Sequence, residues 1–279
     1  MNESKKLPFK LALNTSTLIP FNLNVKQQVS IAAQAGYAGI ELWVRDIVEY
    51  IDNGGTLKEL RKYVCDTGIS VVNAIAFFKW TDASEELREE GFEQAEREMH
   101  MLAEIGCIGV AAPPYGNVDT VTLDDMAHNF AKLTETARKI GVEPYLEFWG
   151  MAKKLSRISE AVYIVIESGV SDAKILLDPF HMYKGGSSVE SLEFIDGKCI
   201  GIVHVNDYPA EPPREIITDN ERVFPGDGTA PSGKIAQLLD NAGYNEYLSL
   251  ELFRQTYGSK SALEVASEGL EKIKKSYSI

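Results

Sequence analysis

The stretch VEPYLEFWGMAKKLSRISEAVYIVIESGVSDAKILLDP, residues 142–179, contains the unit that recurs along the chain. A short run rich in strand-forming residues ends at Glu147, a longer segment ends at Gly169, and a second strand-like run ends at Asp178. Glycine adopts the left-handed conformation at a helix C-terminus at little cost, so Gly169 is a helix stop signal. The stretch therefore predicts a strand, a helix and a second strand.

The same alternation extends from one end of the chain to the other. Eight strands are predicted, at Lys10–Asn14, Gly39–Leu42, Ser70–Ala76, Ile108–Ala112, Val142–Glu147, Lys174–Asp178, Gly201–Val205 and Tyr247–Leu252. Eight strands alternating with helices over 279 residues predict a single (β/α)₈ barrel domain that spans residues 1–279. A doubly wound open sheet is the alternative, but neither GxGxxG nor GxxxxGK(S/T) follows the first strand.

The composition restricts the classes of partner. The net charge of −13 opposes binding to nucleic acid phosphates and to anionic membrane surfaces. No apolar run is long enough for a signal peptide or a membrane-spanning helix. The three cysteines are far apart and form no CxxC motif, so free thiols are expected. We therefore expect a cytoplasmic protein that acts on a small molecule, with neither nucleic acid nor membrane as a partner; the sequence is compatible with a homo-oligomer.

The last four predicted strands carry ionisable side chains at their ends: Glu147, Asp178, His204 and Glu251. Because side chains alternate between the faces of a strand, all four can point toward the barrel axis, at the end where barrel chemistry occurs. Three carboxylates crowded there would repel one another unless they bind a cation or take up protons. Three oxygens and one imidazole suit one divalent ion (Mn²⁺, Zn²⁺, Co²⁺ or Mg²⁺) with two positions open for a hydroxy-ketone. Alternatively, the four are ordinary polar residues at strand ends.

Six motifs carry a resemblance to a known family: GYAGIELW (36–43), PYLEFWG (144–150), LLDPFHMYKGG (176–186), IVHVNDYPAEPPR (202–214), RVFPGDG (222–228) and LSLELFR (248–254). Over nearly its whole length the chain resembles the xylose isomerase-like TIM barrel superfamily of sugar phosphate isomerases and epimerases. Within it, the chain most resembles the inosose (2-keto-myo-inositol) isomerase branch of inositol catabolism. That branch continues SVELFR with Pro and Glu, where this chain has Gln255 and Thr256. The resemblance therefore leaves the exact substrate open.

The resemblance also implies roles for particular residues. It implies a metal held by Glu147, Asp178, His204 and Glu251. It implies that the first and last of these exchange the substrate proton, that His181 contacts a substrate oxygen, and that Arg222 reaches over the substrate. The alternatives are a loop histidine that caps backbone groups and a solvated loop arginine.

Four further residues are assigned from their positions alone. Glu41, at the end of the second strand, could bind a substrate hydroxyl or orient other residues, and Trp149 could wall the pocket or serve only in packing. Asn206 and Asp207 are predicted as partners of His204, or as the start of a loop. That loop, about residues 206–232, is rich in proline and glycine, and the sequence leaves open whether it closes as a lid.

A site with these residues and a divalent ion can catalyse proton transfer next to a ketone. A divalent ion on a ketone oxygen and a neighbouring hydroxyl acidifies the C–H between them, and a glutamate can then remove and return that proton through an enediolate. We therefore expect a metal-dependent isomerase or epimerase of a small keto-polyol or ketose, with 2-keto-myo-inositol as one candidate. The alternatives are a dehydratase at the same metal site and a catalytically silent sugar-binding barrel.

Two further substrate classes can be weighed. Abasic-site DNA cleavage, which uses the same barrel, needs three zinc ions with additional histidine ligands, and this chain has only four histidines. A phosphorylated substrate stays open because the PGDG turn could offer backbone N–H groups to an anion. No basic cluster supports it, so a neutral polyol is preferred.

Overall fold

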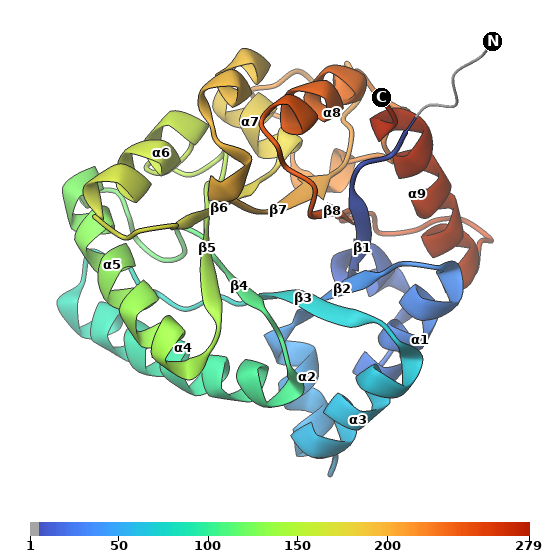
Figure 1. The fold of residues 1–279 in the computed structure, drawn as a ribbon, viewed down its shortest axis with the longest axis horizontal. Coiled ribbons are helices and arrows are strands. Elements are labelled where there is room, and N and C mark those ends of the chain that lie inside the picture. Colours follow the sequence, from blue (N-terminus) through green and yellow to red (C-terminus); the bar gives the residue numbers. More distant parts are fainter. Residues whose placement is uncertain (1–5) are drawn as a thin grey trace.

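The computed structural model describes residues 6–279. The strands are β1 Lys10–Asn14, β2 Gly39–Trp43, β3 Ser70–Ile75, β4 Gly109–Ala112, β5 Glu143–Glu147, β6 Lys174–Leu177, β7 Ile200–Val205 and β8 Tyr247–Leu250. They form one sheet in the order β3-β2-β1-β8-β7-β6-β5-β4, in which every pair is parallel. The two end strands also meet, because the N–H of Ile108, directly before β4, donates to the carbonyl oxygen of Val71 in β3. Figure 1 shows the resulting ring, so the predicted (β/α)₈ barrel is confirmed and the open-sheet alternative is wrong.

Helices surround the ring of strands on its outer side (Figure 1). The α-helices are α1 Val25–Ala35, α2 Val44–Asp52, α3 Leu57–Thr67, α4 Glu85–Ile105, α5 Leu123–Ile140, α6 Ile158–Glu167, α7 Pro179–Gly185, α8 Ser232–Asn241 and α9 Ala262–Tyr277. Short 3₁₀ helices occur at η1 Thr15–Phe21, η2 Val189–Phe194, η3 Gly197–Cys199 and η4 Asp219–Glu221. A left-handed glycine follows each of α1, α3, α4 and α5, with φ between 75° and 99°. Gly169, predicted as a stop signal, lies two residues after α6 with φ 65°.

Three strands end earlier than the sequence predicts: β3 ends one residue early, at Ile75, and β6 and β8 each end directly before a site residue. β6 ends at Leu177, because Asp178 serves as the N-cap of α7. Its Oδ1 accepts hydrogen bonds from the N–H groups of Phe180 at 2.7 Å and His181 at 3.3 Å. β8 ends at Leu250, so Glu251 is the first residue after that strand.

The apolar core has one part between the sheet and the helices and another inside the barrel. Inside the barrel, the ring of Tyr145 packs among the other buried apolar side chains of the interior. A Cβ added at Gly109 would lie 2.3 Å from this ring, and one added at Gly201 would lie 2.5 Å from its opposite edge. The tyrosine is therefore accommodated only because β4, next to β5, and β7, on the far side of β6, carry no side chain at these positions.

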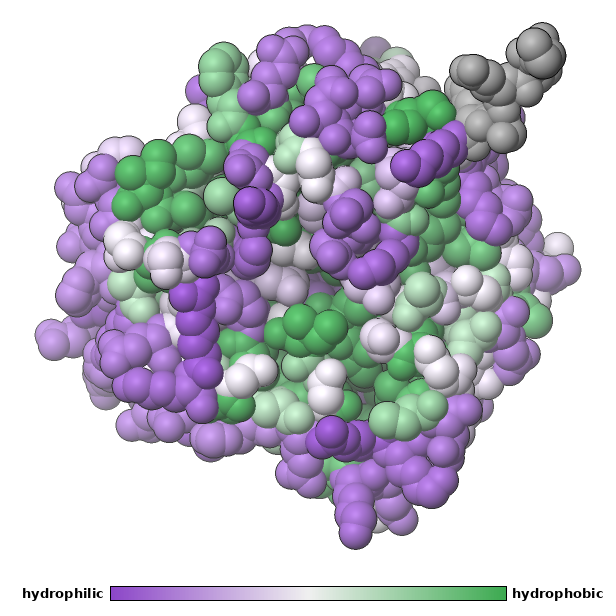
Figure 2. All heavy atoms as spheres, viewed as in Figure 1, coloured by the Kyte–Doolittle hydropathy of each residue, from purple (hydrophilic) through white to green (hydrophobic). Residues whose placement is uncertain are grey.

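The surface is predominantly hydrophilic around its rim, whereas a hydrophobic area lies near the centre of the face shown in Figure 2. Within residues 6–279, none of the helices combines the length and the apolar character needed to cross a lipid bilayer.

Replacing Gly201 by alanine should lower the free energy of unfolding by about 1–3 kcal/mol, because the new methyl group would overlap a ring that Gly109 confines on its other side. Urea denaturation followed by circular dichroism measures this change. The matched control is Gly233→Ala in α8, where an added Cβ would have no atom nearer than 4.0 Å. That substitution should be neutral or stabilise by up to about 1 kcal/mol. Equal stabilities of the two variants would contradict the tight packing of Tyr145.

Candidate active site

The four residues singled out at the strand ends lie together at the C-terminal end of the barrel. Glu147 is the last residue of β5, Asp178 follows β6, His204 lies in β7 and Glu251 follows β8. All four are buried, with no more than 5% of any residue exposed. The alternation of side chains is as predicted, because Leu146, between Tyr145 and Glu147, packs in the outer core while Tyr145 lies inside the barrel.

Three of the four residues are arranged as a metal site. One ligand atom each from Asp178, His204 and Glu251 lies within 4.8 Å of the others. His204 Nδ1 is 3.0 Å from Glu251 Oε2 and 3.7 Å from Asp178 Oδ2, yet it is buried and makes no hydrogen bond. A buried nitrogen between two carboxylates, without a hydrogen bond, matches the donor set of a first-row divalent ion. The residues present therefore fit a metal.

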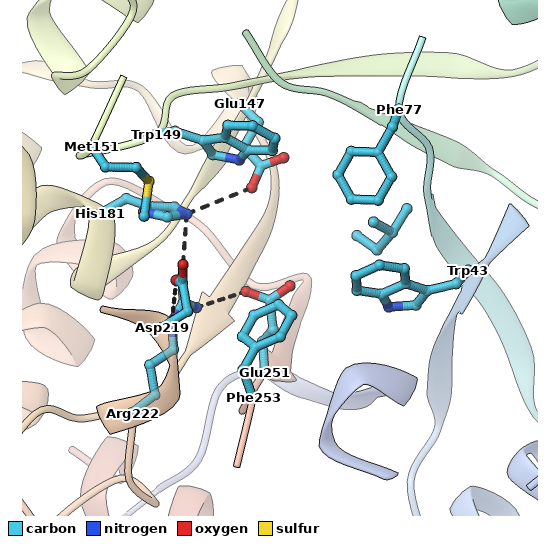
Figure 3. A pocket seen from close by; sticks show the side chains of 11 residues that line it. Trp43, Phe77, Glu147, Trp149, Met151, His181, Asp219, Arg222, Glu251 and Phe253 are labelled. Carbon is cyan, nitrogen blue, oxygen red and sulfur yellow. Dashed lines mark hydrogen bonds and ion pairs between the residues drawn. The ribbon is translucent and has the colours of Figure 1, made fainter. Parts of the chain in front are cut away.

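Glu147 lies outside this group of three. Its Oε1 is 4.0 Å from Nε2 of His181, and its carboxylate lies apart from that of Glu251 (Figure 3). Metal–ligand bonds of about 2.0–2.2 Å bring donor atoms to within roughly 4.4 Å of one another, so Glu147 would have to move inward to become a ligand. Its role as the fourth ligand stays a prediction.

Burial raises the pKa of Glu147 to about 8, against the opposing charge of His204 and with the added repulsion of Glu251. Burial likewise lowers the pKa of His181 to about 4, and the attraction of Asp178 does not restore it. The imidazole of His181 is therefore neutral near pH 7. The backbone N–H of Gly150 points to its Nδ1 at 3.4 Å.

Arg222 supplies the positive charge of the site. Its side chain is 1% exposed, and its Nη1 donates to Asp178 Oδ2 and Glu251 Oε2, each at 2.7 Å. The guanidinium also lies over the rings of Phe180 and Phe253, at 4.5 Å and 5.2 Å from their centroids. Burial alone would raise the pKa of Asp178, but Arg222 together with His181 and His204 outweighs burial and holds that pKa well below its usual range.

Glu41 does not line the cavity. It is fully buried, and its Oε2 accepts a hydrogen bond of 2.6 Å from Nδ2 of Asn73 and lies 3.1 Å from Nε2 of His204. This contact orients the imidazole so that Nδ1 faces Asp178 and Glu251. The predicted substrate contact of Glu41 is therefore replaced by its alternative, the orientation of another residue.

Asn206 and Asp207 were predicted as partners of His204, and this prediction is wrong. Asn206 donates from Nδ2 to Asp178 Oδ1 at 3.1 Å. Asp207 accepts hydrogen bonds from three loop N–H groups, those of Tyr208, Gly226 and Ala230. A single-residue antiparallel bridge also joins Asp207 to Val223, next to Arg222. Asp207 thus fixes the loop that carries the arginine.

The site opens into a cavity of about 330 Å³, near the lower end of the range for small-molecule sites. One side is polar and is formed by Glu147, His181, Asp219, Arg222 and Glu251. The apolar lining is formed by Trp43, Ile75, Phe77, Trp149, Met151 and Phe253. Trp43 and Phe77 lie across the cavity from His181, whereas Trp149 lies beside Glu147 and Phe253 beside Glu251 (Figure 3). Apolar C–H surface and polar hydroxyl groups of one ligand could both be accommodated in such a cavity.

The predicted placement of Trp149 at the cavity wall agrees with the structure, but two aromatic residues and one amide were missed. Trp43 and Phe77 lie with ring centroids 5.4 Å apart on the apolar side. Asn14 accepts from the indole N–H of Trp43 at 3.0 Å and donates to Glu251 Oε1 at 2.9 Å. Trp43 follows Glu41 by two residues in β2, so strand alternation could have found it.

Comparisons with known proteins agree with this geometry. A family model described as a xylose isomerase-like TIM barrel matches residues 29–276. An inosose isomerase of Bacillus velezensis is 29% identical over 274 residues, which cover 94% of this chain and 95% of that protein. A 3-dehydroshikimate dehydratase of Pseudomonas putida is 23% identical over 255 residues, which cover 88% of this chain and 39% of that protein. The crystal structure of the IOLI protein with a bound zinc atom superposes with a TM-score of 0.88 at 25% identity, covering 97% of this chain and 100% of that one.

Glu41→Gln should weaken the binding of Mn²⁺ or Zn²⁺ about 10–100-fold, because the imidazole of His204 would lose the carboxylate that orients it. Titration calorimetry of the protein after chelation measures the affinity. Glu98→Gln, which alters a half-buried carboxylate of α4, is the control and should bind the ions as the parent protein does. Equal affinities of the parent and Glu41→Gln would show that the orienting role is wrong.

Metal affinity should rise with pH. Burial would lower the pKa of His204, but the charges of Glu251 and Glu41 outweigh burial and raise that pKa well above 6.5. A metal ligand must be the neutral imidazole, so binding displaces a proton, and the affinity should increase about tenfold per pH unit below this pKa. Calorimetry in two buffers of different ionisation enthalpy counts the released protons. Binding without proton release between about pH 6 and 7.5 would contradict this assignment.

Proposed function

This chain belongs to the xylose isomerase-like TIM barrel family, and we propose that it isomerises or epimerises a small keto-polyol or ketose. The observation that carries the proposal is the placement of two buried glutamates, Glu147 and Glu251, on the polar side of one cavity that also contains a candidate metal site. The similarity to inosose isomerases over most of both chains makes 2-keto-myo-inositol the first substrate to test and inositol catabolism the first context.

The metal would be held by Asp178, His204 and Glu251, with Glu147 completing the set. We propose Mn²⁺, Zn²⁺, Co²⁺ or Mg²⁺ for this position, and the zinc atom in the IOLI protein supports a divalent ion. When bound, such an ion polarises a carbonyl group and acidifies the neighbouring C–H.

The two glutamates differ in how the protein holds them. Glu251 is fixed through both oxygens, because Asn14 donates to Oε1 at 2.9 Å and Arg222 donates to Oε2 at 2.7 Å. Glu147 faces the cavity, and burial brings its pKa to about 8, close to the operating range of a general base. We therefore assign the first removal of the substrate proton to Glu147.

The proton returns by one of two routes. Glu147 returns it to the neighbouring carbon in an isomerisation, whereas Glu251 delivers a proton to the opposite face in an epimerisation. His181, with a neutral imidazole 4.0 Å from Glu147, is placed to contact the oxygen that gains charge during the transfer. Trp149 belongs to the apolar wall, where it would contact the C–H face of the substrate.

Dehydration is the alternative, and the similarity to a dehydratase favours it over other reactions. The same carboxylates would remove the proton, but a β-hydroxyl would leave before a proton returned to carbon. A catalytically silent barrel is not favoured, because all four predicted ligands are present and buried.

We also propose a cytoplasmic location, which is supported by the free cysteines at positions 65, 107 and 199.

Glu147→Gln should reduce the incorporation of solvent deuterium into the substrate about 10²–10⁴-fold, because the amide cannot accept the proton. NMR measures the exchange into 2-keto-myo-inositol and a panel of ketoses, with Mn²⁺ and after chelation. Glu193→Gln, an exposed residue of η2, is the control and should exchange normally. Loss of a hydroxyl group from the product would identify a dehydratase. The proposal would be wrong if Glu147→Gln bound the metal and exchanged at the parent rate.

A further inference from the structure

Carboxylates occupy four of the five N–H groups of the Arg222 guanidinium. The fifth faces a nitrogen of His181. Nη1 donates to Asp178 and Glu251, and Nη2 lies 3.2 Å from His181 Nε2. The remaining two contacts go to one atom, Asp219 Oδ1, at 2.9 Å from Nε and 2.5 Å from Nη2.

Asp219 differs from the other carboxylates that hold this arginine. The side chains of Asp178 and Glu251 are 1% and 5% exposed, whereas that of Asp219 is 34% exposed. Asp219 lies in η4, within the long loop, and lines the cavity beside Arg222 (Figure 3). It therefore occupies the solvent side of the arginine, where an incoming ligand would first meet the guanidinium.

The charges around the cavity have the same consequence. Among the lining residues of the described chain, Arg222 is the only lysine or arginine, whereas three carboxylates line the cavity: Glu147, Asp219 and Glu251. A phosphate or carboxylate on the substrate that approached Arg222 would thus meet the negative charge of Asp219, which already occupies the Nε and Nη2 donors of the arginine. Like charges brought together in a partly desolvated site strongly disfavour binding.

We propose that Asp219 determines the charge specificity of the site: by occupying Nε and Nη2 of Arg222 on the cavity side, it selects uncharged polyols and rejects phosphorylated or carboxylated ones. This inference rests on the proposed function for the identity of the substrate, but the role of Asp219 in rejecting anions can be measured without turnover. Removal of the carboxylate would expose N–H donors of a guanidinium that other buried groups still hold in place.

The test compares three variants of Asp219 with a control in the same loop. Asp219→Ala frees the two donor positions, Asp219→Asn removes the charge alone, and Asp219→Glu keeps it. Glu221→Gln removes one negative charge from the same 3₁₀ turn, where Glu221 accepts hydrogen bonds from Thr218 and does not contact Arg222. Thermal unfolding establishes that each variant is folded.

The first measurement is the binding of inorganic sulfate to the metal-loaded proteins by calorimetry. Asp219→Ala should bind sulfate at least about tenfold more tightly than the parent, with Asp219→Asn between them. Asp219→Glu and Glu221→Gln should resemble the parent. The second measurement is deuterium exchange into D-fructose and D-fructose 6-phosphate, for which the ratio of kcat/KM should shift toward the phosphate ester by about tenfold or more in Asp219→Ala.

Each outcome bears on one proposal. A folded Asp219→Ala that binds sulfate like the parent, or a shift that Glu221→Gln reproduces equally, overturns the role of Asp219. If no protein exchanges deuterium into 2-keto-myo-inositol or any ketose, the proposed function fails, while the sulfate titration still decides whether Asp219 controls anion binding.

Discussion

The guanidinium of Arg222 lies between Asp178 and Glu251, 2.7 Å from an oxygen of each, where the protein excludes most of the water. Two carboxylates buried this close would otherwise take up protons or separate. His204 adds a second positive or metal-binding group between the same two residues. Two neighbouring residues support this arrangement. Asn206 donates a hydrogen bond to Asp178, and Asp207 fixes the loop that carries Arg222.

The position of Arg222 also depends on the hydrogen bonds that fix its loop. Residues 206–232 are rich in proline and glycine, yet Asp207, near the start of this loop, accepts hydrogen bonds from three of their N–H groups. Asp207 is fully buried and lies two residues after the end of β7. A buried residue next to the barrel therefore helps to position an arginine that lies far along an irregular connection.

The strand ends could be predicted from the sequence because they depend on local periodicity. Alternation along β5 to β8 was enough to bring Glu147, Asp178, His204 and Glu251 to one end of the barrel. The direction in which Glu41 points was not predictable, since it depends on the neighbouring strands β3 and β7, which supply Asn73 and His204. The partners of the loop residues were missed for the same reason: they are through-space contacts between segments that no spacing rule connects. The position of Glu147 outside the compact group of three depends on side-chain geometry, which strand alternation does not determine.

The packing of Tyr145 between Gly109 and Gly201 affects how substrate enters and product leaves the cavity. Because the ring and its buried apolar neighbours pack inside the barrel, the interior is a packed core and not a channel through which a ligand could pass. A molecule that enters must leave by the way it came. Product still bound therefore blocks the next substrate completely, so accumulated product would act as a competitive inhibitor. The net rate of turnover would therefore depend on how fast a later reaction consumes the released product.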